Sequence, residues 1–235
     1  MPVSTDMLDG GVAVVTLSPA ASSNTFSPDH FDPFLSCLQE LMGNPSCRSV
    51  VITGSGRFFS SGGNMDDFSD AIENGNIGSR VQEMTDKLHP LLLKMRTSEK
   101  VFVCAINGSA AGGGLGLALA SDYRVCSPEA KLASAFFRLG LSPDGGTTWL
   151  LPRLVGNQVA RKFFFNSEVW SAKQALDYGA VDELADPSIK GKLCLRNRRG
   201  VYNQCLVAFM LDEQEKAATE GWITGMVNNL AEPVF

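Results

Sequence analysis

A run of three glycines joins two apolar segments, and it constrains the fold more than any other part of the sequence. Asn107–Gly114 follows the strand-like run Val101–Ile106 and precedes a small, helix-like run over 115–121. Glycine has no Cβ atom, so the backbone here can approach a ligand closely. The first N–H groups of a helix lack internal partners and lie at the positive end of its dipole. The turn therefore predicts an anion or oxyanion site, or alternatively close helix–strand packing without a ligand.

The glycine run differs from two common phosphate-binding patterns. It contains no Gly-Lys-Ser/Thr, so it is not a P-loop, and it lacks the G-x-G-x-x-G spacing of dinucleotide sites. A pocket at this turn therefore needs a different ligand.

Composition predicts a soluble globular protein that binds neither nucleic acid nor membranes. The chain has 235 residues, a net charge of −5 and 44% hydrophobic residues. A negative net charge argues against nucleic-acid binding, and no apolar stretch approaches the length of a membrane span. A secretory signal has a basic segment followed by an apolar run, and the N-terminus shows no such pattern. We therefore expect a cytoplasmic protein, with an organelle matrix as the other possibility.

The cysteines and histidines predict neither a disulfide framework nor a metal site. Six cysteines are scattered without a C-x-x-C pair, which is typical of reduced thiols in a reducing compartment. The two histidines, His30 and His89, are far apart and have no cysteine at ligand spacing.

Strand-like and helical segments alternate along the first 186 residues, which indicates an α/β fold. Strands are expected at 12–17, 49–53, 101–106 and 122–126, and helices at 28–42, 81–95, 113–121, 157–166 and 171–178. Ser27-Pro28 is a helix start, because serine caps a helix and proline suits its first position. From about Pro187 the strand signals fade, and 190–230 reads as an amphipathic helical region. We therefore divide the chain into a core, 1–186, and a helical C-terminal region, 187–235, that covers a pocket or forms subunit contacts.

Four motifs together resemble the crotonase superfamily, also called the enoyl-CoA hydratase/isomerase family. They are Ser60–Asn64, Ala111–Gly114, Leu139–Thr147 and Trp149–Gly156, and the likeness extends from about Val12 to Asp186. The resemblance implies a core of repeated ββα turns forming a spiral, here with a shortened C-terminal helical region. It also implies acyl-coenzyme A thioester substrates and a homo-trimer or hexamer.

The resemblance assigns roles to residues at the first two glycine turns. By motif position, the backbone N–H groups of Gly63 and Gly113 would bind the thioester oxygen as it becomes an enolate oxygen. Such donors contribute about 3–4 kcal/mol each to transition-state stabilisation. Ser61, Asn64 and Met65 would line the same turn and contact the CoA moiety. No metal or separate cofactor is implied, since coenzyme A enters as part of the substrate.

The sequence departs from the family's hydratases at two positions. Those enzymes carry two glutamates, and the corresponding positions here are Gly116 and Phe136. Adding water to a double bond needs one group to activate the water and an acid to deliver a proton. Ordinary hydratase activity is therefore not expected. Phe136 would line an apolar acyl pocket, or is simply a core aromatic residue.

Asp144 remains as a candidate acid/base. In family isomerases with a similar turn, a single acidic residue moves a proton from C2 to C4 of a 3-enoyl-CoA. Partial burial beside Phe136 should raise the pKa of Asp144, which helps one group act as both base and acid. The alternative is that Asp144 only caps the turn or the following helix, because Pro-Asp-Gly is ordinary turn chemistry.

Other functions within the superfamily remain open. 4-Chlorobenzoyl-CoA dehalogenases use an aspartate at the Asp144 position as a nucleophile and a histidine near the position of His89. They have a tryptophan where this chain has Phe136. A non-catalytic crotonase-fold binding module would also tolerate the missing glutamates. The main prediction is an enoyl-CoA isomerase of fatty acid metabolism that shifts a 3-enoyl to a 2-enoyl double bond.

Overall fold

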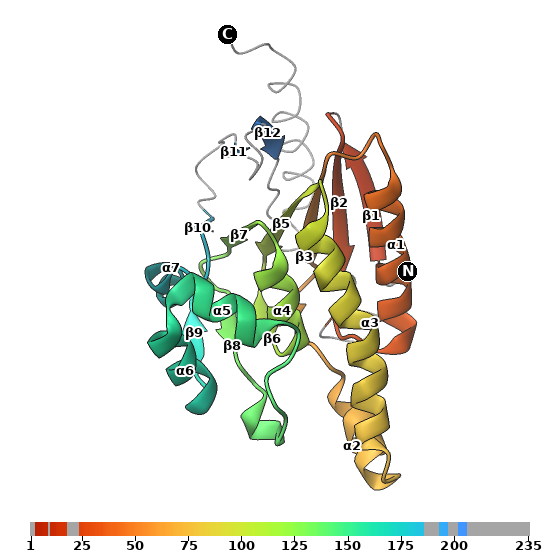
Figure 1. Cartoon of the computed structure of the whole chain (residues 1–235), viewed down its shortest axis with the longest axis vertical. Coiled ribbons are helices and arrows are strands. Elements are labelled where there is room, and N and C mark those ends of the chain that lie inside the picture. The colour runs from red at the N-terminus through yellow and green to blue at the C-terminus, as the bar shows by residue number, and fades with distance from the viewer. Residues whose placement is uncertain (1–2, 9, 18–23, 186–192, 197–201, 206–235) are drawn as a thin grey trace.

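Two main β-sheets organise the fold (Figure 1). The computed structural model describes residues 3–8, 10–17, 24–185, 193–196 and 202–205. The six-stranded sheet has the order β1 (Val3–Leu8), β2 (Val12–Leu17), β3 (Ser49–Gly54), β5 (Val101–Ile106), β7 (Tyr123–Cys126), β10 (Glu183–Leu184). The four-stranded sheet has the order β4 (Phe58–Ser60), β6 (Ser109–Ala111), β8 (Lys131–Ala133), β9 (Val169–Ser171). Only β1–β2 and β8–β9 pair antiparallel within these two sheets of the described chain; their other pairs are parallel.

A repeated unit builds both sheets at once. In β3–β4, β5–β6 and β7–β8, the first strand joins the large sheet and the second joins the small one. The helices are α1 (Pro28–Gly43), α2 (Met65–Glu73), α3 (Ile77–Thr97), α4 (Gly113–Ala120), α5 (Thr147–Val155), α6 (Asn157–Phe165) and α7 (Ala172–Tyr178), with the 3-10 turn η1 (Phe137–Leu139). This winding confirms the predicted α/β spiral core of ββα turns.

The core is centred on β5 and α4. All six residues of β5 and all eight of α4 are buried. A helix that is apolar on every side has to be enclosed by other elements, and α4 is packed on α3, α5 and β6. Cys104 and Cys126 lie buried in this core as free thiols. The glycine turn before α4 is thus fixed by a rigid centre.

The predicted start of α1 is confirmed, whereas strand β1 was not predicted from the sequence. Helix α1 begins at Pro28 with Ser27 as its N-cap. The sequence reading missed β1, which is mostly exposed and pairs antiparallel with β2. No described helix is long and apolar enough to cross a membrane.

The expected helical C-terminal region also differs where the structure describes it. Strands β11 (Leu193–Arg196) and β12 (Tyr202–Cys205) form an antiparallel pair instead of helix. Pairing across a short connection satisfies the backbone groups of both segments. The remainder of 187–235 lies outside the described residues, so the division at 186 stays a prediction.

Candidate active site

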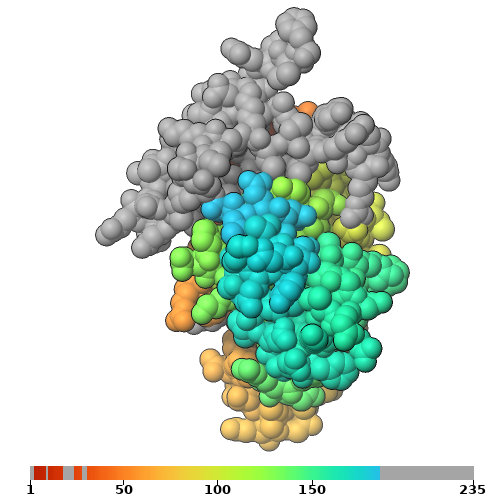
Figure 2. All heavy atoms as spheres, turned by 90° about the vertical axis from the view of Figure 1, so that its left-hand side faces the viewer, coloured from red at the N-terminus to blue at the C-terminus, as the bar shows by residue number. Residues whose placement is uncertain are grey.

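A cavity of about 330 Å³ opens beside the N-terminus of α4. Its size is within the range of small-molecule sites, and its lining is mostly apolar. In Figure 2, the residues of α5–α7 (teal and blue) lie above the tan segment that contains α2. The lining residues are Ser61, Gly63, Met65, Phe68, Val81, Met84, Gly112, Gly113, Ala133, Ala135, Phe136, Arg138, Leu139, Leu141, Asp144, Ser167 and Val169.

The two glycine turns meet at this cavity. A Cβ atom on Gly62 would lie 2.7 Å from the backbone nitrogen of Gly113 and 2.9 Å from the carbonyl oxygen of Ala111. Only glycine allows this approach, and Gly62 also has a φ of +81°. The next residue, Gly63, lines the cavity together with Gly113, the first residue of α4. The structure thus brings together two residues that are far apart in the sequence.

Asp144 lies in a turn in which the next two residues, both glycines, have left-handed backbone conformations. Gly145 and Gly146 both have positive φ values, +57° and +70°, and Gly146 is the N-cap of α5. The backbone N–H and hydroxyl of Thr147 donate to the carbonyl oxygen of Asp144, at 3.0 and 2.7 Å. No hydrogen bond joins the Asp144 carboxylate to another described residue. Thr147 therefore binds the main-chain carbonyl of Asp144, and the side-chain carboxylate of Asp144 is not used in this turn.

Burial and His89 act in opposite directions on the Asp144 carboxyl. Burial raises its pKa above the ordinary value, because water solvates the ionised form better than the cavity does. The nearby His89 of α3 partly offsets this effect and lowers the pKa. Nε2 of His89 also accepts a hydrogen bond of 3.2 Å from the backbone N–H of Gly145. His89 is therefore in contact with the turn that holds Asp144.

The two positions that carry glutamate in family hydratases have different surroundings here. Phe136 is 4% exposed and lines the cavity. Gly116 packs its α-carbon against the Asp144 turn, so that a Cβ atom on it would lie 2.4 Å from the carbonyl oxygen of Gly145. The backbone of the turn thus occupies the space into which a side chain at 116 would extend.

The residues predicted to contact CoA divide into two groups. Ser61 and Met65 line the cavity, as Phe136 does. Asn64 is not among the cavity's lining residues, and its side-chain oxygen accepts a hydrogen bond of 2.9 Å from the backbone N–H of Asp66. This bond caps α2, which is a common use of asparagine before a helix.

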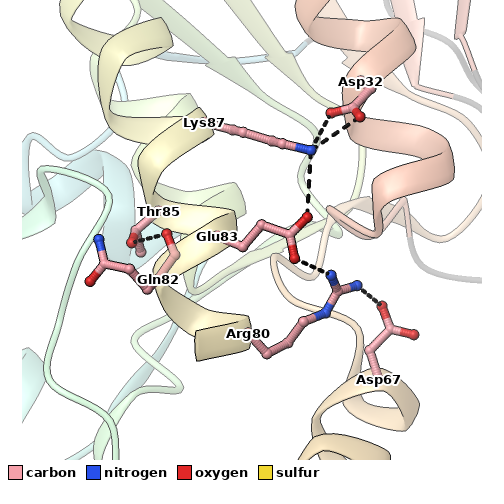
Figure 3. Close-up of polar contacts among 7 residues, drawn as sticks. All are labelled: Asp32, Asp67, Arg80, Gln82, Glu83, Thr85 and Lys87. Carbon is pink, nitrogen blue, oxygen red and sulfur yellow. Dashed lines mark hydrogen bonds and ion pairs between the residues drawn. The ribbon is translucent and has the colours of Figure 1, made fainter. Parts of the chain in front are cut away.

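A chain of ion pairs links α1, α2 and α3 (Figure 3). Arg80 of α3 contacts Asp67 of α2 at 3.2 Å and Glu83 at 2.9 Å, and Lys87 of α3 contacts Asp32 of α1 at 2.8 Å. These side chains are partly exposed, so each pair contributes about 0.2–1 kcal/mol. Together the pairs orient α2 and α3, which supply four of the lining side chains.

Several lining residues could not be found from the sequence. Phe68 and Met84 repeat with the spacing of ordinary core positions, and Arg138 and Ser167 belong to no motif. Only the paired strands β8 and β9 bring the segments around Arg138 and Ser167 to the same cavity. Across the described residues, no cluster of three histidine, cysteine or acidic side chains is arranged to hold a metal ion.

Comparisons with known proteins agree with this architecture. Residues 8–194 match the family model described as enoyl-CoA hydratase/isomerase. "Probable enoyl-CoA hydratase EchA14" of Mycobacterium tuberculosis is 30% identical over 186 residues, which are 79% of this chain and 71% of that protein. The 1,2-epoxyphenylacetyl-CoA isomerase of Escherichia coli is 32% identical over 182 residues, 76% of this chain and 68% of that protein. Other matching relatives are named 4-chlorobenzoyl coenzyme A dehalogenases, from Arthrobacter sp.

A solved structure gives the same result. The structure of Pseudomonas aeruginosa DspI superposes with a TM-score of 0.71 at 30% identity, covering 80% of this chain and 69% of that one. The spiral of ββα units, the paired glycine turns and the sequence matches lead to one assignment. The chain belongs to the enoyl-CoA hydratase/isomerase family, the crotonase superfamily.

Proposed function

We propose that this protein is an enoyl-CoA isomerase that converts a 3-enoyl-CoA into a 2-enoyl-CoA. The observation that carries the proposal is that Gly63, Gly113 and Asp144 line one mostly apolar cavity. This cavity offers one carboxylate, and a double-bond shift needs only one group to move a proton.

In the proposed reaction, the thioester oxygen accepts hydrogen bonds from the N–H groups of Gly63 and Gly113. Ionised Asp144 removes a proton from C2, and the electrons of that C–H bond form the enolate. The double bond then moves from C3–C4 to C2–C3 as Asp144 returns the proton to C4. Coenzyme A takes part as a portion of the substrate, and the scheme uses no further cofactor.

Three features of the site support these roles. Gly113 is the first residue of α4, where N–H groups lack helical partners and the dipole favours negative charge. The carboxylate of Asp144 has no hydrogen-bond partner among the described residues. Its raised pKa also brings it closer to a value at which it can both accept and donate a proton.

Turnover of 3-hexenoyl-CoA by the wild type and by Asp144→Asn tests this proposal. Asparagine has almost the same size but cannot accept the proton, so turnover should fall by about 10²-fold or more. Binding of hexanoyl-CoA should remain, which would separate the result from loss of the fold. A fully active Asp144→Asn variant would refute the mechanism. Binding without any turnover by the wild type would favour a non-catalytic module, and fast hydration of 2-hexenoyl-CoA would favour a hydratase.

One observation favours a second candidate, a hydrolytic dehalogenase acting on an aromatic acyl-CoA. His89 contacts the Asp144 turn through its hydrogen bond with Gly145, and Nε2 would have to give up that bond in order to activate water after attack by the aspartate. The discriminating experiment measures chloride release from 4-chlorobenzoyl-CoA by the wild type and by His89→Gln. Chloride release that depends on His89 would replace the isomerase proposal, whereas isomerisation needs only Asp144.

We further propose that the protein assembles as a homo-trimer or a pair of trimers. Large apolar side chains are exposed on adjacent elements, with Trp149 63% and Phe165 70% accessible in the single chain. Light scattering after gel filtration measures the subunit number, and a monomer at micromolar concentration would contradict the proposal.

A further inference from the structure

The lining of the cavity includes an arginine that the proposed isomerisation does not use. Among the described residues that line the cavity, Arg138 of η1 has the one positively charged side chain. It forms no ion pair or hydrogen bond with other described residues, and it is exposed to solvent. The remaining wall around it is mostly apolar, so a cation at this position calls for an explanation.

The strand pairing brings the segment of a second polar lining residue, Ser167, next to η1. Ala133 of β8 pairs with Val169 of β9, and the rings of Phe137 and Phe165 lie 5.5 Å apart. These contacts place η1 beside the turn that contains Ser167. Ser167 also lines the cavity.

Two residues near Arg138 and Val169 that line the cavity have an uncommon backbone conformation. Ala135 and Ser167 have positive φ values of +60° and +48°, and both line the cavity. Residues with a Cβ atom adopt this conformation only where the surrounding structure imposes it, and such residues concentrate at binding sites. The arginine and the serine are thus presented on a defined backbone.

We propose that Arg138, with Ser167, forms a subsite for a carboxylate at the far end of the acyl chain. The substrate class would be 3-enoyl-CoA thioesters of dicarboxylic acids, and this proposal rests on the proposed function. A guanidinium group binds a carboxylate through two parallel hydrogen bonds, which gives both affinity and orientation. An apolar cavity without such a partner would exclude the carboxylate, because its desolvation would go uncompensated.

Exposure of Arg138 fits this role. The guanidinium stays hydrated while the site is empty, so the protein carries no buried unpaired charge in the absence of substrate. A carboxylate at the end of the chain would displace that water and leave the apolar methylene groups of the acyl chain against Leu139 and Val169.

The test compares two saturated, unreactive ligands of equal chain length, adipyl-CoA and hexanoyl-CoA, by calorimetry. The wild type should bind adipyl-CoA roughly tenfold more tightly, and Arg138→Gln should abolish this preference without weakening hexanoyl-CoA. The matched control is Arg161→Gln, at an exposed arginine of α6 that does not line the cavity, and it should keep the preference.

Other outcomes overturn the subsite. An equal loss of affinity for both ligands would mean that Arg138 contacts the phosphates of coenzyme A. A wild type without preference would remove the basis for the proposal. Turnover of 3-hexenedioyl-CoA and 3-hexenoyl-CoA is measured separately. If adipyl-CoA is preferred but neither enoyl substrate is isomerised, the isomerase proposal fails while the subsite stands.

Discussion

Replacing Gly116 by alanine tests whether α4 positions the Asp144 turn. The added Cβ atom would lie 2.4 Å from the carbonyl oxygen of Gly145, and real Cβ contacts essentially never fall below 3.0 Å. Helix and turn would therefore have to separate by about 0.6 Å, since both contacting parts are backbone. Overpacking costs about 1–3 kcal/mol, while the better helix propensity of alanine returns about 0.8–1 kcal/mol. We expect a net loss of about 0–2 kcal/mol in the free energy of unfolding.

The effect on turnover should exceed the effect on stability. Misplacing a reacting group by 1 Å can cost about 10²-fold in rate, so a shift of about 0.6 Å should lower kcat roughly tenfold or more. The assay measures kcat and KM for 3-hexenoyl-CoA alongside thermal unfolding. Gly78→Ala is the matched control, because Gly78 is also helical and a Cβ atom there meets nothing within 4 Å. The control should keep full activity and gain up to about 1 kcal/mol of stability.

Two results would refute this reasoning. Wild-type kcat in Gly116→Ala would show that the position of the turn does not limit the reaction. A similar loss of activity in Gly78→Ala would show that the assay responds to helix stability and not to the contact with Gly145.

Three further predictions follow from the charges. Because proton removal needs ionised Asp144, kcat/KM should fall as the pH decreases through its raised pKa. Burial raises the pKa of Asp144 in the folded state above its value in the unfolded state. The contribution of Asp144 to stability is therefore complete below the unfolded-state pKa and is lost as the pH rises through the folded-state pKa. Asp144→Asn should raise Tm near neutral pH and have less effect in acid. Arg80→Met breaks the pairs with Asp67 and Glu83 and should cost about 1 kcal/mol or less in chemical unfolding, with a smaller difference at high salt.

Local patterns in the sequence were enough to predict the elements that carry strong short-range signals. Ser27-Pro28 located the start of α1, and the apolar run Val101–Ile106 located β5. The glycine run before α4 predicted a site at the helix start, and a cavity lies there. For α1 and β5 the deciding interactions lie within a few residues along the chain, where propensity and capping rules apply.

Features that depend on distant contacts could not be predicted in this way. The hydrogen bond between His89 and Gly145 joins α3 to a turn in a later ββα unit. That the segments around Arg138 and Ser167 line one cavity depends on the pairing of β8 with β9, and β9 was not predicted from the sequence. Asn64 has a local role as well, because its side chain caps α2, and its contact with CoA stays a prediction.

The contact between Gly116 and Gly145 also bears on the proposal of a single acid/base. A carboxylate can be brought to this part of the site from the turn, as Asp144 is, or from α4, but the carbonyl of Gly145 already fills the direction in which a side chain at 116 would point. Gly116→Glu must therefore displace the turn in order to fit. Any gain in hydration of 2-hexenoyl-CoA should come with loss of isomerisation of 3-hexenoyl-CoA, and the ratio of the two rates measures this exchange. A variant that gained hydration while keeping full isomerisation would show that both carboxylates fit together, and the steric argument would then be wrong.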